Sequence, residues 1–312
     1  MVEVTHTDEA RGNELIATKG IEPIETPRMG QIEADPDPAN GQVPDLIPTS
    51  CKNPVVIQGD AGRLPLPDQS VDLVFASPPY MDARTYGTDD IARDCSQWVE
   101  WMLAVTHEAL RVSRGVVMWV VAGVQRKGLY QPAPEGLAWE AHRAGIRLLW
   151  PNYWQKNSLP RGKAWFRPET EYVLAFCRQN VKPYFDHSEI GLPPKYGRGG
   201  RFRNRRKDGS RDDGVYPTVK LAVPGNVCYV TVGGGGHMGS VLAHENEAPF
   251  PERLADRFVR ACCPPGGIVL DPFCGSGTTL AAAMKAGRRS IGVDIRAAQC
   301  ELTKRRLREA SC

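Results

Sequence analysis

A strand–turn–helix pattern at residues 268–280 constrains the fold of this chain more than any other feature. The segment reads Ile-Val-Leu-Asp-Pro-Phe-Cys-Gly-Ser-Gly-Thr-Thr-Leu, so a short apolar strand runs into a turn that contains Gly275 and Gly277. The glycines allow the backbone to come close to a ligand, and Thr278 and Thr279 begin a helix whose first amides can hold polar groups. The pattern predicts a ligand site at the tip of the strand.

The next strand, residues 289–293, ends at Asp294. A carboxylate at this position can accept both hydroxyls of a ribose. Position 280 is Leu, so the third glycine of the dinucleotide fingerprint is missing, and the chain has no G-x-x-x-x-G-K-[ST] sequence. We therefore expect a nucleoside without a pyrophosphate. A glycine-rich turn that only packs is the alternative, which Asp271 and Asp294 beside the turn disfavour.

Apolar strands alternate with helices over most of the chain. This alternation predicts an α/β fold, in which helices cover both faces of a mostly parallel sheet. We expect strands at 54–60, 71–76, 115–121, 146–150, 170–177, 267–270 and 289–293, and helices at 96–112, 137–144, 251–263, 277–286 and 297–308.

The segment Ser77-Pro78-Pro79-Tyr80 follows the strand at 71–76. Proline cannot continue a central strand, so the chain leaves the sheet there, at the end where parallel sheets carry active sites. The two prolines fix the backbone, so the Ser77 hydroxyl and the Pro78 carbonyl can present two acceptors to one amino group. Tyr80 adds a flat face for stacking. The set suits a planar base with an exocyclic amino group.

Two acceptors on such an amino group have a chemical consequence. The nitrogen lone pair is delocalised into the ring, and hydrogen bonds to both hydrogens favour tetrahedral geometry, which frees the lone pair. Each bond contributes on the order of 1–3 kcal/mol in a dry site. A plain turn is the alternative, which the glycine-rich turn in the same chain disfavours.

The charge of the chain is unevenly distributed. The net charge is only +3, but residues 1–50 carry ten acidic and three basic side chains, so the rest is basic. The densest basic run should contact phosphates and give salt-dependent affinity for nucleic acid; the alternative is a basic loop without a role. Some arginines can read guanine, but the sequence does not show which. The run comprises Lys195, Arg198, Arg201, Arg203, Arg205, Arg206, Lys207 and Arg211, with Tyr196 and Phe202 between them.

Several classes of protein are excluded or disfavoured. No run of about 18 apolar residues occurs, and the first residues lack the pattern of a signal peptide. The nine cysteines include no C-x-x-C pair, and the six histidines have no metal-ligand spacing. We therefore expect a cytoplasmic protein with no metal site and no contact with a membrane.

These motifs together resemble those of the β class of amino-directed DNA methyltransferases, in which the S-P-P-Y segment comes first, a basic variable region follows, and D-P-F-x-G-S-G-T-T comes last. Ser at the first position of S-P-P-Y is typical of enzymes that methylate cytosine N4, whereas adenine-N6 enzymes usually carry Asp or Asn. Further matches lie at 59–60, 64–67, 70–73, 84–87, 171–176, 244 and 248–252. Two features depart from the family pattern: three residues separate His244 from Ala248, and the acidic leader is not part of the family core.

The resemblance implies a Rossmann-like methyltransferase fold with an inserted target-recognition region, and S-adenosyl-L-methionine (SAM) as cofactor. Residues 1–50 are rich in Pro, Glu, Asp and Gly without apolar periodicity, so we expect an acidic disordered leader there. The resemblance divides the rest into a catalytic half (51–178), a basic recognition region (179–240) and a SAM-binding half (241–312). Ser77, Pro78, Pro79 and Tyr80 would hold the flipped base. Asp60 would reach the adenine of the cofactor, Phe250 and Pro251 would form a wall, and Asp294 would bind the ribose. The methionine end would lie against Asp271, Phe273, Gly275, Ser276, Gly277 and Thr278.

The resemblance also implies double-stranded DNA as substrate, bound by the basic run and by Arg84 and Tyr86 on a loop. The expected activity is site-specific methylation of cytosine N4 within a restriction–modification system, with a cognate endonuclease as a separate protein and the enzyme as a monomer or homodimer. Adenine-N6 methylation is the nearest alternative, and a non-catalytic DNA-binding regulator is another. Cytosine-C5 chemistry is disfavoured because it uses a Pro-Cys nucleophile, which this chain lacks.

Overall fold

The structure, a computed structural model, describes residues 53–81, 94–157, 168–194, 200–215, 219–232, 241–242 and 249–310. All of them belong to one compact unit, Val43–Cys312. The helices are α1 (Cys95–Val112), α2 (Ala133–Arg143), α3 (Glu252–Cys262), α4 (Thr278–Lys285) and α5 (Ala297–Ala310). The strands are β1 (Val55–Gln58), β2 (Val71–Ala76), β3 (Ser113–Val121), β4 (Val124–Arg126), β5 (Leu129–Gln131), β6 (Arg147–Leu148), β7 (Asn152–Gln155), β8 (Thr170–Cys177), β9 (Arg201–Arg205), β10 (Arg211–Val215), β11 (Val227–Tyr229), β12 (Ile268–Asp271) and β13 (Arg289–Asp294).

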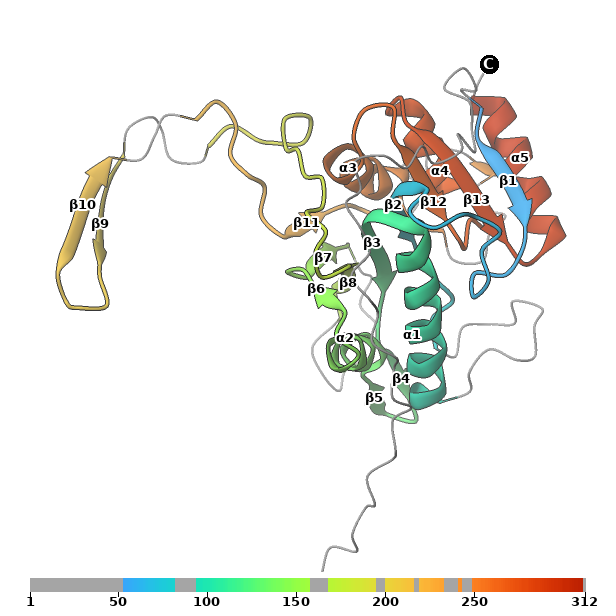
Figure 1. The fold of residues 1–312 in the computed structure, drawn as a ribbon, viewed down its shortest axis with the longest axis horizontal. Coiled ribbons are helices and arrows are strands. Elements are labelled where there is room, and N and C mark those ends of the chain that lie inside the picture. The colour runs from blue at the N-terminus through green and yellow to red at the C-terminus, as the bar shows by residue number, and fades with distance from the viewer. Residues whose placement is uncertain are drawn as a thin grey trace, which may run out of the picture. The chain divides into compact units, whose positions relative to one another are not determined.

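One twisted sheet organises the described residues (Figure 1). Its strand order is β1-β13-β12-β2-β3-β8-β7-β11, with β6 paired to β8. The five strands from β1 to β3 are parallel, β8 runs antiparallel to β3 and β7, and β11 is parallel to β7. The predicted α/β fold with a mostly parallel sheet is thus confirmed.

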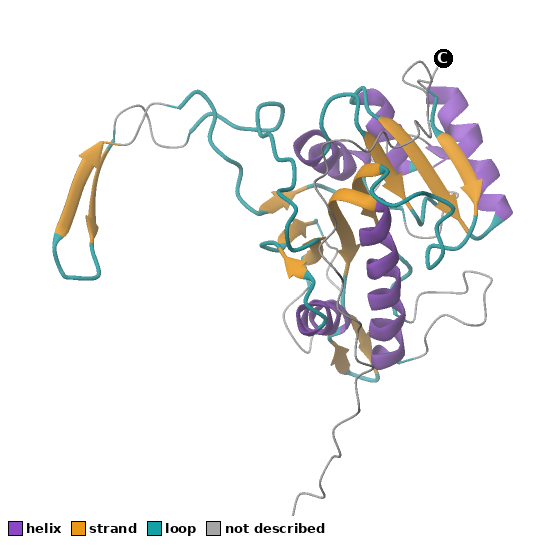
Figure 2. Ribbon diagram, viewed as in Figure 1, coloured by secondary structure: helices purple, strands orange, loops and turns teal. Residues whose placement is uncertain are grey.

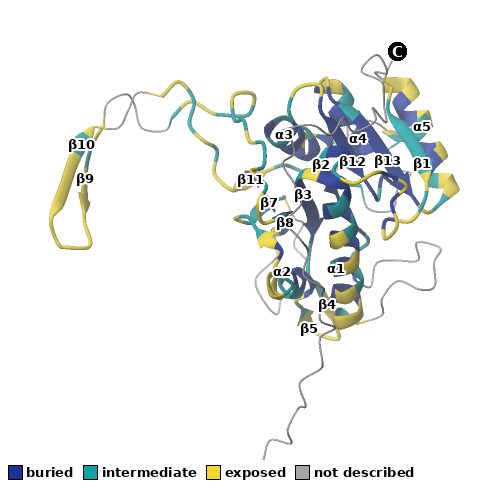
Figure 3. Ribbon diagram, viewed as in Figure 1, coloured by how far each residue is buried: buried dark blue, intermediate teal, exposed yellow. Residues whose placement is uncertain are grey.

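Helices pack on both faces of the sheet, because its central strands alternate buried side chains between the two faces. In β2, Val74 and Ala76 pack in one core cluster with residues of α1 and α2, whereas Leu73 and Phe75 pack in another with residues of α3 and α4. Helix α5 packs against β1 and β13. In Figure 3 the central strands carry the dark blue of buried residues.

Local signals explain where α1 and α4 begin. The Asp94 carboxylate accepts a hydrogen bond from the Gln97 amide at 2.9 Å, which caps α1. Gly277 precedes α4 in the left-handed region, at a φ of 78°, which L side chains rarely adopt. The backbone conformation of the turn therefore requires glycine at position 277.

The direction of the connections creates a switch point in the sheet. From β12 the chain passes through α4 to β13 on one side, and from β2 it passes through α1 to β3 on the other. Ligands of open parallel sheets bind at the carboxyl ends of the strands beside such a point. The segments that follow β12 and β2 are the two singled out by the sequence.

The predicted strands and helices of the two core segments all occur, with small shifts at their ends. The prediction for 146–150 was too long, since only Arg147–Leu148 is a strand. Strands β7 and β11 were not predicted, because each is short and β11 pairs with a segment about 75 residues away in sequence. The region 179–240 also contains a hairpin, β9–β10, that composition did not indicate (Figure 2).

Some predictions concern residues outside the described part of the chain. They are the leader at 1–50, the segment with His244 and Ala248, and the side chains of Arg84, Tyr86, Lys195 and Arg198. In the described part, no helix has the length and apolar composition needed to cross a bilayer.

Candidate active site

Four adjacent parallel strands end at one edge of the sheet, and each is followed by residues that the sequence analysis selected. Asp60 follows β1, Asp294 ends β13, Asp271 ends β12, and Ser77 follows β2. The register pairs Gln58 with Asp294, Asp271 with Gly292, and Val74 with Leu270. The fold therefore brings the S-P-P-Y segment and the glycine-rich turn, almost 200 residues apart in sequence, to neighbouring strand ends.

Two hydrogen bonds to neighbouring elements hold the S-P-P-Y segment in place. The Ser77 hydroxyl donates to the Val120 carbonyl on the neighbouring strand β3, at 3.2 Å. The Trp98 indole of α1 donates to the Pro79 carbonyl at 2.8 Å. Because the Ser77 hydroxyl gives its one proton to the backbone, both of its lone pairs remain available to accept.

Tyr80 is held by a buried carboxylate that the sequence analysis did not select. Its hydroxyl donates to Glu171 Oε2 at 2.6 Å, and Lys156 Nζ forms an ion pair with Glu171 Oε1. Glu171 is only 6% exposed. It lies near the start of the antiparallel strand β8, which reaches the same edge as the ends of the parallel strands. Glu171 and Lys156 together set the orientation of the Tyr80 ring.

The glycine-rich turn is fastened to the end of β13. The Gly275 amide donates to Asp294 Oδ2 at 3.0 Å, and the Thr303 hydroxyl of α5 donates to the Gly275 carbonyl at 2.8 Å. A Cβ atom on Gly277 would lie 2.8 Å from Thr303 Cγ2. The missing side chain of Gly277 thus also serves close packing against α5.

A buried acid ends β12. The Asp271 side chain accepts a hydrogen bond from the Phe273 amide at 3.0 Å and is 2% exposed. Burial raises the pKa of its carboxyl to about 7, although the nearby Thr279 hydroxyl and the bond from the Phe273 amide oppose this rise. In the described part of the chain no Lys or Arg forms an ion pair with Asp271. A ligand ammonium group would stabilise this carboxylate, so the site fits the amino-acid end of SAM.

A buried ion pair supports the same turn from α5. Arg306, 1% exposed, donates to the Ser276 carbonyl at 3.2 Å and to the Thr278 hydroxyl at 2.9 Å. Its other nitrogen pairs with Glu252 at 3.1 Å. Glu252 is the first residue of α3 and also pairs with Lys285. One guanidinium therefore joins the turn to the start of α3, next to Phe250 and Pro251.

Aromatic rings surround the turn. Phe273 makes edge contacts with Trp101 and Trp119, at centroid distances of 5.8 and 6.2 Å. Phe250 contacts Phe75 of β2 at 5.9 Å, and the Thr279 hydroxyl donates to the Phe75 carbonyl at 3.3 Å. The Phe250 segment, the turn and β2 are thus linked through one residue.

Two groups of predicted site residues, Asp60 and the basic run, are exposed where the structure describes them. Asp60 lies at the same edge but is exposed, and its carboxylate caps the Gly62 amide at 2.8 Å. The arginines of the basic run that the structure describes lie on the β9–β10 hairpin and are exposed, with Lys207 in its turn. Their roles remain predictions.

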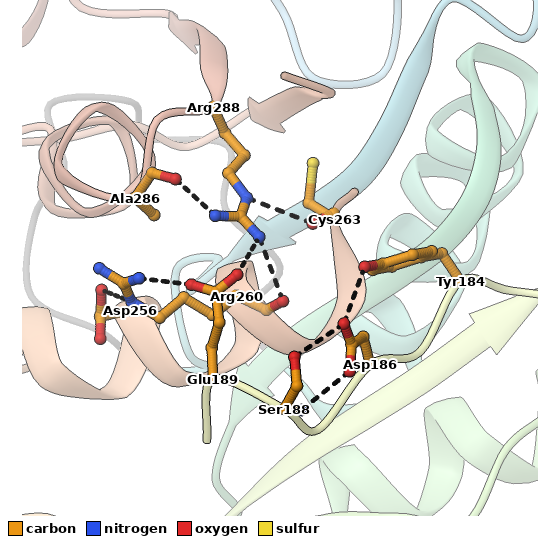
Figure 4. Close-up of polar contacts among 9 residues, drawn as sticks. All are labelled: Tyr184, Asp186, Ser188, Glu189, Asp256, Arg260, Cys263, Ala286 and Arg288. Atoms are coloured by element: carbon orange, nitrogen blue, oxygen red, sulfur yellow. Dashed lines mark hydrogen bonds and ion pairs between the residues drawn. The ribbon is translucent and has the colours of Figure 1, made fainter. Parts of the chain in front are cut away.

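The chain that leads into the basic region is attached to α3 and to Arg288, which lies just before β13 (Figure 4). Glu189 pairs with Arg260 of α3 at 2.5 Å and with Arg288 at 2.9 Å, and the Arg288 side chain is 4% exposed. The Asp186 amide donates to the Ala261 carbonyl at 2.9 Å. The residues before the hairpin therefore have a fixed attachment to α3 and to the segment before β13.

Sequence reasoning missed Glu171, Lys156, Glu252 and Arg306. Glu171 had a signal, because it is a charged residue in a strand that is otherwise largely apolar. Arg306 had none, since a basic residue in a C-terminal helix is ordinarily exposed. Its burial follows from the packing of α5 beneath the turn.

Comparison with known proteins identifies the family. A family model described as DNA methylase, for enzymes of the N6 and N4 type, matches residues 71–305. The match spans both the S-P-P-Y segment and the glycine-rich turn.

Individual relatives are similar over most of their length. The type II methyltransferase M.ScaI of Streptomyces caespitosus is 29% identical over 237 residues, which cover 74% of this chain and 73% of the relative. The DNA adenine methyltransferase YhdJ of Escherichia coli (strain K12) is 27% identical over 265 residues, which cover 82% and 83%.

Solved structures share the fold. The PvuII DNA methyltransferase (cytosine-N4-specific) aligns with a TM-score of 0.59 at 18% identity, over 83% of this chain and 91% of that one. The Thermus thermophilus protein TTHA0409, complexed with SAM, aligns with a TM-score of 0.54 at 24% identity, over 82% and 94%.

Proposed function

This chain belongs to the N6/N4 DNA methylase family and is a SAM-dependent DNA methyltransferase, and we propose that it methylates the exocyclic N4 of cytosine in double-stranded DNA. The observation that carries the proposal is the Ser77 hydroxyl, which lies after β2 and donates its proton to Val120. Ser77 can then act toward a base only as an acceptor. An amino group of a planar base is the partner that such an acceptor suits.

The target base must leave the DNA stack before its amino group can reach this edge. Ser77 Oγ and the Pro78 carbonyl accept the two hydrogens of N4, while Pro79 keeps the backbone rigid. Tyr80 stacks on the base, and Glu171 and Lys156 hold Tyr80 in place. These residues orient the nitrogen and make its lone pair available.

When bound, SAM supplies a methyl group on a positively charged sulfur. Asp271 pairs with its ammonium group, and Asp294 accepts its ribose hydroxyls. The turn from Phe273 through Gly275, Ser276 and Gly277 to Thr278 surrounds its methionine end, Phe250 and Pro251 form a wall, and Asp60 reaches its adenine.

The transfer is a direct displacement. A bond forms between N4 and the methyl carbon while the carbon–sulfur bond breaks, and sulfur keeps the electron pair. The methylated nitrogen then loses one proton, to Ser77 or to water. No covalent bond between the enzyme and the base is required.

Adenine-N6 methylation is the second candidate. It is favoured by the similarity to YhdJ, a DNA adenine methyltransferase. Two acceptors and an aromatic face would serve the amino group of adenine by the same chemistry. The first position of the catalytic segment is Ser, which favours cytosine.

DNA is bound in this proposal by Arg84, Tyr86 and the basic run, from Lys195 and Arg198 to Arg201, Arg203, Arg205, Arg206 and Lys207. The relatives named type II methyltransferases suggest a restriction–modification role with a separate endonuclease. The enzyme then acts as a monomer or homodimer on each site.

The proposal is tested by mass analysis of nucleosides from DNA methylated by the purified full chain. N4-methylcytosine is expected, and N6-methyladenine alone would overturn the choice of base. The variant Ser77→Ala should slow methyl transfer about 10- to 100-fold, the effect of one lost hydrogen bond of about 1–3 kcal/mol.

A matched control is Ser70→Ala at the other end of β2. The Ser70 hydroxyl also donates to a carbonyl, that of Pro67, at 2.7 Å. This variant should keep the rate of transfer within about threefold. If Ser77→Ala keeps the full rate, the assigned role of Ser77 is wrong.

A further inference from the structure

The described part of the basic run, residues 201–211, lies in a two-stranded antiparallel ribbon. Strands β9 and β10 each have five residues and are joined by a turn at 206–210. Gly209 has a φ of 84°, and Asp208 accepts hydrogen bonds from the amide and hydroxyl of Ser210, so the turn is ordered. The register of the ribbon therefore determines which side chains share a face.

The two faces of the ribbon differ in chemistry. Side chains of an antiparallel pair alternate between faces, and residues directly opposite each other share one. The basic face carries Arg201, Arg203 and Arg205 from β9, with Val215, Asp213 and Arg211 opposite them. The other face carries Phe202 opposite Gly214 and Asn204 opposite Asp212.

The aromatic face is closed by packing. A Cβ atom on Gly214 would lie 2.4 Å from the Phe202 ring, so the ring lies across the glycine. The Phe202 ring therefore covers part of its own face, and the basic face lies on the opposite side of the ribbon.

The acids of the two strands neutralise some arginines but not others. Asp213 pairs with Arg203 at 3.1 Å on the basic face, and Asp212 pairs with Arg206 at 3.2 Å on the other. Arg205 and Arg211 lie directly opposite each other, and in the described part of the chain neither has a carboxylate partner. Like charges directly opposite each other destabilise a ribbon. Two unpaired arginines placed opposite each other lower the stability of the ribbon, and natural proteins keep such an unfavourable arrangement mainly at functional sites.

The dimensions of the ribbon match one form of nucleic acid. The major groove of B-DNA, about 12 Å wide, admits a two-stranded β-ribbon. Five residues at about 3.4 Å each span about 17 Å, the rise of about five base pairs. Arginine pairs bidentately with the O6 and N7 atoms of guanine in that groove.

We propose that the basic face of this ribbon enters the major groove, where Arg205 and Arg211 each read a guanine of the recognition sequence. Arg203 and Arg206 are held by their aspartates and do not read a base. This assignment rests on the proposed function, because it needs duplex DNA as the substrate. It does not depend on which base is methylated.

The test is selection of bound duplexes from a random library by the full chain, followed by sequencing. Arg205→Gln and Arg211→Gln are compared with Arg203→Gln, which removes the same charge from the same face. Each of the first two should lose preference for guanine at one position by about tenfold or more, because a bidentate contact contributes about 1–3 kcal/mol of discrimination. Arg203→Gln should keep each preference within about threefold.

Three results would overturn the proposal. One is a wild-type consensus without guanine. Another is that Arg205→Gln and Arg211→Gln keep the wild-type consensus and bind every duplex more weakly, as phosphate contacts would. The third is that Arg203→Gln loses as much preference as the other two variants. SAM binding by each variant confirms that the methyltransferase core is folded. A product of N6-methyladenine would overturn the cytosine proposal while leaving this result intact.

Discussion

The glycine-rich turn and the β9–β10 ribbon differ in how far their charged side chains are buried. In the turn, Asp271, Asp294 and Arg306 are buried, and each has protein partners that hold it in position. On the ribbon, every arginine is exposed, and Arg205 and Arg211 have no carboxylate partner in the described residues (Figure 3). Methyl transfer needs groups fixed before the substrate arrives, whereas sequence reading needs charges whose partner is the DNA itself.

This difference predicts opposite effects of mutation. A change beneath the turn should damage the fold because it leaves buried polar groups without partners. A change on the ribbon should leave the fold intact and alter only the interaction with DNA, since exposed ion pairs contribute little to stability.

The largest effect is expected for Arg306→Met. Removal of the guanidinium leaves Glu252 buried with Lys285 alone, and it takes a donor from Ser276 and Thr278. The free energy of unfolding, measured with denaturant, should fall by about 3–5 kcal/mol. Arg308→Met, on the exposed side of α5, is the control and should change it by less than about 0.5 kcal/mol. A loss below about 1 kcal/mol in Arg306→Met would show that the buried pair does not support the turn.

A second effect is expected from the pH dependence of Asp271. Its carboxyl has a pKa of about 7 in the fold, above the value of about 3.9 in an unfolded chain. The folded protein without ligand therefore binds the extra proton, and its stability falls as pH rises from about 4 to about 7.

SAM binding should respond in the opposite sense, because in the proposed site its ammonium group pairs with the Asp271 carboxylate. Its affinity, measured by calorimetry, should weaken about fivefold from pH 7 to pH 6, an interval in which an α-amino group stays charged. In Asp271→Asn the binding should be weaker and lose this dependence. The same fivefold change in Asp271→Asn would place the titrating group elsewhere.

The smallest effect on the fold is expected for the triple variant of Arg203, Arg205 and Arg206 to Gln. Its free energy of unfolding should stay within about 0.5 kcal/mol of wild type, because these side chains are exposed. The slope of log affinity for DNA against log salt should become less negative, because the variant removes three positive charges from the ribbon that is proposed to bind DNA. An unchanged slope would remove the ribbon from the DNA interface.

The sequence analysis predicted most of the elements near the site because their signals are local. The apolar run at 71–76 followed by Ser77-Pro78-Pro79, and the glycines between 268 and 280, each define a strand and its end. Parallel strands place such ends at one edge, so the shared position of the two segments also followed from the pattern.

The ribbon and the supporting side chains were beyond that reasoning. Strands β9 and β10 contain arginine, aspartate and glycine rather than an apolar alternation, so no periodic signal marks them. Glu171 contacts Tyr80 only because β8 runs antiparallel to β3. The residues of a strand do not by themselves determine the direction in which it pairs with its neighbour.

The sequence by itself determined the α/β class, the order of the two motifs and the chemistry that each can perform, because these depend on residue types within a few positions of one another. Only the tertiary structure decided that Arg306 lies buried under the turn, that Glu171 holds Tyr80, and that Arg205 lies opposite Arg211. Those pairings depend on the register and packing of distant segments, which are set by burial of the whole sheet rather than by any local pattern.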